Sequence, residues 1–179
     1  MIQIKSRPEL VRDVQNHIFI EPSFLSLELC KKLISYGEKN KVSDKSNHPG
    51  RHEVCGLDDS QEVHEQLDKI WEKSINYFES NVYFVETYLL KKYGPMSYFG
   101  RHIDNYISVA NKIDRKLSMT VQLSDENDYK GGEVVVEGVT LPKKIGTVIV
   151  FPSNYYHEVK SIKQGVRWSL VTWAWGNAF

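Results

Sequence analysis

The segment GTVIVFPSNYYHEVKSIKQGVRWSLVTWAW, residues 146–175, gives the clearest indication of the fold class of this chain. It contains two runs rich in β-branched and aromatic residues, GTVIVF at 146–151 and VRWSLVTWAW at 166–175, with polar residues between them. Side chains of this kind favour strands, and polar segments with glycine or proline favour turns. The segment therefore predicts strands of a mainly β structure.

The same pattern extends toward the N-terminus as far as Asn81. Three more runs have strand composition: YFVETYLLKKY at 83–93, KLSMTVQL at 116–123 and GEVVVEGVTL at 132–141. A succession of short strands after helices is typical of an α+β layout. We expect a mainly β sandwich or jelly roll, with N-terminal helices packed on one sheet.

Two helices are predicted in the first 80 residues. Residues 26–39 carry apolar side chains at helical spacing, and Ser26 is a suitable N-cap. A second helix is expected from about Ser60. The apolar faces consist of Leu27, Cys30, Leu33 and Ile34 in the first helix, and of Val63, Leu67, Ile70, Trp71 and Phe78 in the second.

Residues 41–58, KVSDKSNHPGRHEVCGLD, are polar and read as a long loop. Long loops of this kind often act as lids over binding sites. The sequence leaves open whether this loop closes as a lid over a site, and we expect its His48, Arg51 and His52 to be solvated. The helical part would span residues 1–80 and the β core residues 81–179, within one domain.

Composition limits the function classes. The chain has 179 residues, two cysteines, and 23 basic against 23 acidic residues. A neutral balance gives no support for a nucleic-acid partner. No run approaches the about 20 apolar residues needed to span a bilayer, and the first residues lack the apolar run of a signal peptide. We expect a cytoplasmic protein that does not bind membranes.

A candidate metal site lies in GRHID at 100–104. His102 and Asp104 are two residues apart, so in an extended segment both side chains point to one side. A second histidine, His157, follows GTVIVF and the Pro152 turn. Two histidines and one carboxylate form the facial triad of non-haem iron oxygenases. The His-x-Asp pair alone is weak evidence for a metal site. The alternative is a surface histidine that lies beside an aspartate and binds no metal.

Arg167 opens the last predicted strand. On that strand Arg167 shares a face with Ser169, Val171 and Trp173. A buried arginine requires an anion, and its planar fork matches a carboxylate. The alternative is an edge strand with a solvated arginine. Ser118, Thr120 and Gln122 likewise form a polar face that looks either to solvent or into a cavity.

At this point the sequence resembles the iron(II)- and 2-oxoglutarate-dependent oxygenases of the prolyl 4-hydroxylase-like family. The resemblance runs from about Ile18 to Trp175. It is carried, in the family's order, by FLSLELCKKLISYGE (24–38), YLLKKYGPMSYFGRHID (88–104), LSDENDYKGGEVVVEG (123–138) and the opening segment (146–175). The resemblance implies a double-stranded β-helix, a form of jelly roll.

The resemblance also implies the site. His102, Asp104 and His157 would bind Fe(II), and Arg167 would bind the distal carboxylate of 2-oxoglutarate, with Ser169 beside it. Tyr93 matches a cosubstrate-binding tyrosine, and Trp173 a tryptophan at the edge of the substrate cleft. Gln122 stands where some members carry a cosubstrate-binding tyrosine, a departure that leaves its role open. Dioxygen is the second cosubstrate, and ascorbate is a further candidate cofactor.

The implied activity is hydroxylation of a protein or peptide proline, of the procollagen-proline type, with release of succinate and CO2. Two alternatives stay open: the same chemistry on a small molecule, free amino acid or nucleobase, and a non-catalytic jelly-roll binding module. The sequence leaves the oligomeric state undetermined.

Overall fold

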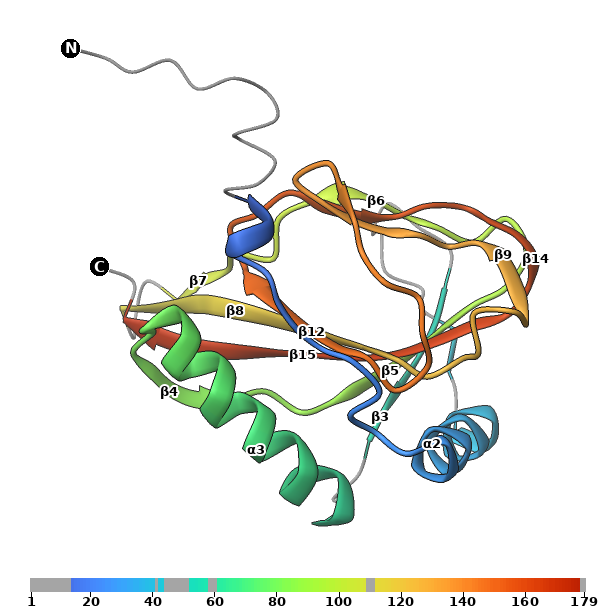
Figure 1. Cartoon of the computed structure of the whole chain (residues 1–179), viewed down its shortest axis with the longest axis horizontal. Coiled ribbons are helices and arrows are strands. Elements are labelled where there is room, and N and C mark those ends of the chain that lie inside the picture. The colour runs from blue at the N-terminus through green and yellow to red at the C-terminus, as the bar shows by residue number, and fades with distance from the viewer. Residues whose placement is uncertain (1–13, 41, 44–51, 58–60, 109–111, 178–179) are drawn as a thin grey trace.

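The computed structural model describes residues 14–40, 42–43, 52–57, 61–108 and 112–177. The described residues form three layers (Figure 1): a small sheet, a large sheet, and two helices on the other face of the large sheet. Every strand pair for which the register is defined is antiparallel. A mainly β architecture with N-terminal helices on one sheet is what the sequence predicts.

The large sheet is centred on its two longest strands, β8 (Ile113–Gln122) and β15 (Arg167–Asn177). Its order is β1-β12-β8-β15-β5-β3-β2, with β4 pairing with β15 and β7 with β8. The other strands are β1 (Phe19–Glu21), β2 (Val42–Ser43), β3 (Glu53–Gly56), β4 (Val82–Val85), β5 (Leu89–Tyr93), β7 (Ile107–Ser108) and β12 (Val148–Pro152).

The small sheet has the order β11-β10-β13-β6 and lies across one face of the large sheet (Figure 1). It consists of β6 (Phe99–His102), β10 (Val134–Val136), β11 (Val139–Thr140) and β13 (His157–Val159). Strands β9 (Tyr129–Gly131) and β14 (Ile162–Gly165) form a separate pair.

Helix α2 (Leu27–Asn40) begins as the sequence predicts. The Leu29 amide donates to Ser26 Oγ at 3.1 Å, which confirms Ser26 as the N-cap. Cys30 and Leu33 are buried, but Leu27 is 51% exposed, so its assignment to the packed face was wrong. The buried face continues instead to Gly37.

Helix α3 (Gln61–Phe78) presents the predicted face to the large sheet. Val63, Leu67, Ile70 and Trp71 are buried, and Phe78 packs at the margin of the same cluster. Leu117, Met119 and Val121 of β8 belong to this cluster too. Because residues alternate along a strand, the polar face of β8 is turned toward the small sheet. A second cluster fills the space between the two sheets.

Residues 41–58 were expected to form one loop, but this segment contains two strands. Val42–Ser43 and Glu53–Gly56 are strands β2 and β3, and β3 pairs with β5. The helical N-terminal part therefore also supplies strands to the large sheet. Residues 41, 44–51 and 58 of this segment, which include His48 and Arg51, lie outside the described residues. Strand β3 was not predicted because it is only four residues long and lies within a polar segment.

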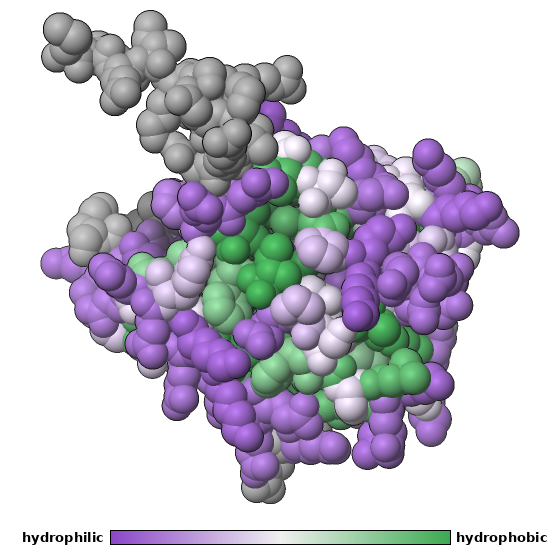
Figure 2. All heavy atoms as spheres, in the orientation of Figure 1, coloured by the Kyte–Doolittle hydropathy of each residue, from purple (hydrophilic) through white to green (hydrophobic). Residues whose placement is uncertain are grey.

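On the face drawn in Figure 2, hydrophilic side chains surround a central area where apolar side chains reach the surface. None of the described helices combines the length and the apolar composition that crossing a bilayer requires.

Candidate metal centre

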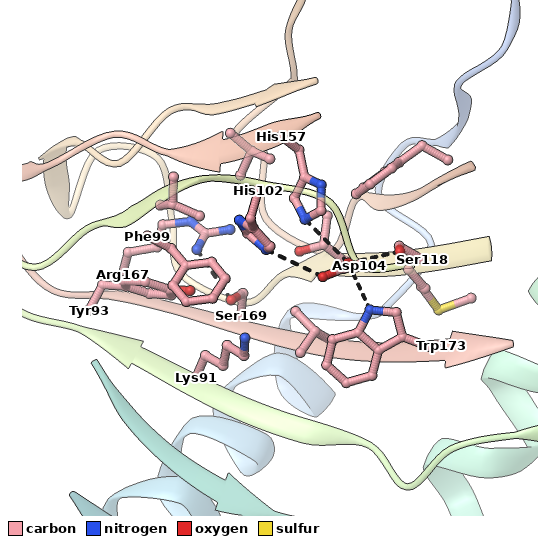
Figure 3. A pocket seen from close by; sticks show the side chains of 16 residues that line it. Lys91, Tyr93, Phe99, His102, Asp104, Ser118, His157, Arg167, Ser169 and Trp173 are labelled. Carbon is pink, nitrogen blue, oxygen red and sulfur yellow. Dashed lines mark hydrogen bonds and ion pairs between the residues drawn. The ribbon is translucent and has the colours of Figure 1, made fainter. Parts of the chain in front are cut away.

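Two strands of the small sheet bring the predicted metal ligands together. His102 ends β6 and His157 begins β13, and the two residues are direct partners in the sheet register. Asp104 follows β6, where its amide donates to Ser153 O at 2.9 Å. One ligand atom from each of His102, Asp104 and His157 lies within 4.8 Å of the others (Figure 3). Ligands from two distant segments of the chain, around residue 103 and at His157, thus converge on one point.

The two histidines are oriented by the backbone. His102 Nδ1 lies 2.7 Å from Gly100 O, and His157 Nδ1 lies 3.0 Å from Tyr155 O. Each Nδ1 donates its proton to a carbonyl oxygen, which leaves Nε2 as the ring atom that faces Asp104 and that would bind a metal after losing its proton. The Nε2 atoms lie 3.3 and 3.2 Å from the Asp104 carboxylate. This donor set fits a divalent transition metal.

Asp104 is held as an anion. Its Oδ2 accepts hydrogen bonds from Trp173 Nε1 at 2.7 Å and from Ser118 Oγ at 2.8 Å. Burial works to raise the pKa of Asp104, but hydrogen bonds from His102, His157 and Trp173 outweigh it and hold the pKa far below its usual range. The carboxylate is therefore ionised and fixed in orientation.

Arg167 lies at the other end of the same cavity. Only 1% of the residue is exposed. Its Nη1 donates to Ser169 Oγ at 3.2 Å and its Nη2 to Gln122 Oε1 at 2.9 Å, while Nε has no hydrogen-bond partner among the described residues. A buried guanidinium whose donors are incompletely used suits a carboxylate ligand. The alternative of a solvated arginine on an edge strand is wrong, since β15 is central and Arg167 is buried.

Tyr93 and Gln122 flank this arginine from the neighbouring strands. Tyr93 is the β5 partner of Arg167, whose Cζ lies 5.3 Å from the ring centroid. Burial raises the pKa of Tyr93 to about 12, so the hydroxyl stays protonated and able to donate. Gln122 accepts from Arg167 and donates through Nε2 to Pro142 O at 3.1 Å. Its amide therefore fixes Arg167 in place.

Every side chain predicted for the site except Gln122 lines one cavity (Figure 3). The cavity is lined by the triad together with Tyr93, Arg167, Ser169 and Trp173. Gln122 does not line it but accepts a hydrogen bond from Arg167. Ser118 and Thr120 also line it, so the polar face of β8 looks into the cavity and not to solvent.

Two residues of this region were not predicted from the sequence: Phe99 packs against His102 with ring centroids 4.1 Å apart, and Lys91 lines the cavity. Ser118 was predicted only as part of a polar face, and its hydrogen bond to Asp104 was not foreseen. Strand alternation from Tyr93 would have placed Lys91 inward. His52, expected to be solvated, is 8% exposed and stacks on Tyr93 at 5.2 Å between ring centroids.

Comparison with known proteins agrees with this geometry. Residues 88–175 match the family described as the 2OG-Fe(II) oxygenase superfamily. A PKHD-type hydroxylase of Prochlorococcus marinus (strain MIT 9515) is 41% identical over 80 residues, which is 42% of this chain and 35% of that protein. A PKHD-type hydroxylase of Picosynechococcus (strain PCC 7002) is 37% identical over 93 residues, 50% of this chain and 42% of that protein. The chain thus spans well under half the length of these relatives.

Two solved structures share the fold. A Pseudomonas putida prolyl-4-hydroxylase superposes with a TM-score of 0.74 at 17% identity, covering 93% of this chain and 96% of that one. The viral collagen prolyl hydroxylase of Paramecium Bursaria Chlorella virus-1, in its 2OG complex, gives 0.70 at 19% identity, covering 89% and 96%. These matches confirm the predicted jelly roll. The family and the His-Asp-His triad together imply Fe(II) and 2-oxoglutarate as cofactor and cosubstrate.

Proposed function

We propose that this chain, whose residues 88–175 match the 2OG-Fe(II) oxygenase superfamily, is a dioxygenase that hydroxylates a proline of a protein or peptide. The reaction consumes 2-oxoglutarate and O2 and releases succinate and CO2. One observation carries the proposal: the three ligand atoms within 4.8 Å of one another share a cavity with the buried Arg167. The proposed unit is a single domain over residues 1–179, with a helical part to residue 80 and the jelly-roll core after it.

In this proposal His102, Asp104 and His157 hold Fe(II). Arg167 binds the distal carboxylate of 2-oxoglutarate, because its fork is buried and aimed into the cavity. Ser169 and Tyr93 contribute hydroxyl groups beside that carboxylate. Gln122 acts on the cosubstrate through Arg167, whose Nη2 it fixes at 2.9 Å.

Bound Fe(II), with 2-oxoglutarate and O2, supplies the oxidising chemistry, and ascorbate is a proposed accessory reductant. The chain's own residues orient the reactants and exclude water. Ser118 and Trp173 keep the Asp104 carboxylate in one orientation. Val134, Phe151 and Val159 line the cavity with apolar surface, which limits side reactions with solvent.

Proline is proposed as the target on two grounds. Two solved structures that share the fold are a prolyl-4-hydroxylase and a collagen prolyl hydroxylase. Trp173 also lines the cavity beside Asp104, where a flat aromatic face suits a pyrrolidine ring. The most specific version of this proposal is that the enzyme prefers prolines in procollagen-type peptide sequences. Mass spectrometry of a broad proline-peptide panel should show the gain of one oxygen atom on proline, and a panel with no such product would exclude prolyl hydroxylation.

Arg167→Met tests the cosubstrate site directly. The Kd for 2-oxoglutarate, measured by calorimetry on Mn(II)-loaded protein, should rise at least about tenfold, because a charge-assisted bond contributes about 1.5–3 kcal/mol. Arg101→Met is the matched control, since Arg101 is exposed and its guanidinium lies over the Tyr156 ring. Equal Kd values in all three proteins would refute the role of Arg167.

A further inference from the structure

Tyr129 is a buried tyrosine near Arg167 that the proposed reaction does not use. It lies on β9, is 3% exposed and belongs to the apolar cluster between the two sheets. Its hydroxyl oxygen has no hydrogen-bond partner among the described residues. A buried polar atom without a partner destabilises a packed core, so a hydroxyl kept at this position indicates a role beyond packing.

Arg167 carries the matching donor. Its Nη1 donates to Ser169 and its Nη2 to Gln122, whereas Nε has no hydrogen-bond partner in the part of the chain that the structure describes. The Nε–H group of an arginine only donates, and a phenolic oxygen accepts. Each of these two buried side chains therefore has one unused polar atom, and the two atoms are complementary.

The two side chains pack against the same glycine. A Cβ atom on Gly132 would lie 3.2 Å from Arg167 Cδ, the carbon bonded to Nε, and 3.2 Å from Tyr129 Cε2, which neighbours the carbon that bears the hydroxyl. Burial raises the pKa of Tyr129, and the positive charge of Arg167 works against this rise. The hydroxyl is therefore protonated and lies close enough to the guanidinium to be influenced by its charge.

The ring of Tyr129 is fixed by its other neighbours. Lys143 Nζ lies 4.1 Å from the ring centroid and donates to Gly131 O at 2.9 Å. Tyr129 also pairs with Gly165 of β14, where a Cβ atom would lie 2.9 Å from Tyr129 Cα. Close packing of this kind holds a side chain in one orientation. The direction of the hydroxyl is thus set before any ligand binds.

The count of donors on Arg167 explains what such a contact would do. A guanidinium has five N–H groups, one on Nε and two on each Nη. Ser169 and Gln122 use one N–H on each Nη. If Nε donates to Tyr129, one N–H on each Nη is left. A carboxylate accepts two such N–H groups in a bidentate contact.

We propose that Tyr129 is a positioning residue for the cosubstrate, whose hydroxyl oxygen accepts a hydrogen bond from Arg167 Nε when the guanidinium binds the distal carboxylate of 2-oxoglutarate. This inference rests on the proposed function and adds a residue to its cosubstrate site. Tyr129 is not among the residues that line the metal cavity, so it acts through Arg167.

Ligand binding to Mn(II)-loaded protein tests the proposal without turnover. The two ligands are 2-oxoglutarate and 2-oxovalerate, in which a methyl group replaces the distal carboxylate. Each Kd is measured by calorimetry for the unaltered chain, Tyr129→Phe, Arg167→Met and the double variant. Tyr88→Phe is the matched control, because Tyr88 is a buried tyrosine of the other apolar cluster.

The unaltered chain and Tyr88→Phe should bind 2-oxoglutarate at least about tenfold more tightly than 2-oxovalerate. Tyr129→Phe should raise the Kd for 2-oxoglutarate about three- to tenfold and leave the Kd for 2-oxovalerate unchanged, because the second ligand has no group for Arg167 to bind. In the Arg167→Met background, Tyr129→Phe should have no further effect.

Tyr129→Phe should remain folded, because it removes a hydroxyl that has no partner among the described residues. Urea denaturation should show that its free energy of unfolding is no lower than that of the unaltered chain. The loss of cosubstrate affinity would then have no counterpart in stability, which separates positioning of Arg167 from a general structural role.

Three results would overturn the proposal: an unchanged Kd for 2-oxoglutarate in Tyr129→Phe, an equal loss for both ligands, or an effect of Tyr129→Phe that persists without Arg167. If the unaltered chain does not prefer 2-oxoglutarate to 2-oxovalerate, the proposed cosubstrate role of Arg167 fails, and this inference fails with it. A preference that Tyr129→Phe retains in full refutes the role of Tyr129 alone.

Discussion

Trp173 contacts the candidate metal centre through one polar atom. Its indole Nε1 donates to Asp104 Oδ2 at 2.7 Å, and its ring lies 3.9 Å from the Arg115 guanidinium carbon. Trp173→Phe removes the hydrogen bond and keeps an aromatic ring. We expect the Kd for Mn(II), measured by electron paramagnetic resonance, to rise about 10–100-fold, as is usual when a group that orients a metal ligand is lost.

Trp175→Phe is the control for this substitution. Its indole Nε1 donates to Glu86 Oε1 at 2.5 Å and not to Asp104. The Mn(II) affinity of Trp175→Phe should remain within about threefold of the unaltered chain. An equal loss in both variants would mean that Trp173 acts through the general packing of β15.

The sequence predicts the site residues unevenly, for physical reasons. His102, Asp104 and Arg167 follow from strand alternation, because side chains two apart share a face. Ser118 and Lys91 obey the same rule, but a serine and a lysine in strands have common solvated roles that spacing alone does not exclude. His52 could not be predicted to be buried, because its burial depends on contact with Tyr93 and Phe99 from distant parts of the chain.

The contact between α2 and the large sheet depends on the absence of a side chain at Gly37. A Cβ atom there would lie 2.5 Å from Trp168 Cζ3, which belongs to a buried side chain of β15. Gly37→Leu should lower the free energy of unfolding by about 2 kcal/mol or more, because overpacking displaces well-ordered neighbours. Urea denaturation of the purified chain measures this change.

Ser35→Leu supplies the comparison, since it places the same side chain on the exposed face of α2. Its free energy of unfolding should change by less than about 0.5 kcal/mol. If Gly37→Leu were no less stable than Ser35→Leu, α2 would not pack closely on the sheet.

At the scale of elements, the long runs were predictable and the short ones were not. The strand-rich segments after Asn81 and both helices appear where composition and periodicity place them. Strand β3 was missed because EVCG is short, polar in context and stabilised by pairing with β5, which is distant in sequence. Leu27 was misplaced because apolar spacing at the start of α2 fits two neighbouring faces.

The stability of the whole molecule should decline at alkaline pH. Burial raises the pKa of Cys30 from 9.0 to about 11 and, with the nearby Asp68, that of Tyr88 from 10.0 to about 12. Between pH 9 and about 11 for Cys30, and between pH 10 and about 12 for Tyr88, the unfolded chain has released a proton that the folded chain still holds. The free energy of unfolding therefore falls as the pH rises through these ranges. Each group contributes a slope of up to about 1.4 kcal/mol per pH unit.

Urea midpoints between pH 8 and pH 11 measure this slope. Tyr88→Phe should make the decline shallower, whereas Tyr83→Phe, at a residue that is 54% exposed, should leave it unchanged. A decline of the same steepness in both variants would show that Tyr88 does not contribute.

Succinate release from 2-oxoglutarate tests most directly whether the whole chain acts as an oxygenase. The unaltered chain should release succinate in air only when Fe(II) and 2-oxoglutarate are both added. His102→Ala should reduce the rate at least about 100-fold, because it removes one of three proposed ligands. His17→Ala, at an exposed histidine that contacts Tyr155, should retain full activity. Full turnover by His102→Ala, or turnover without added iron in metal-free buffer, would contradict the proposed iron-dependent activity.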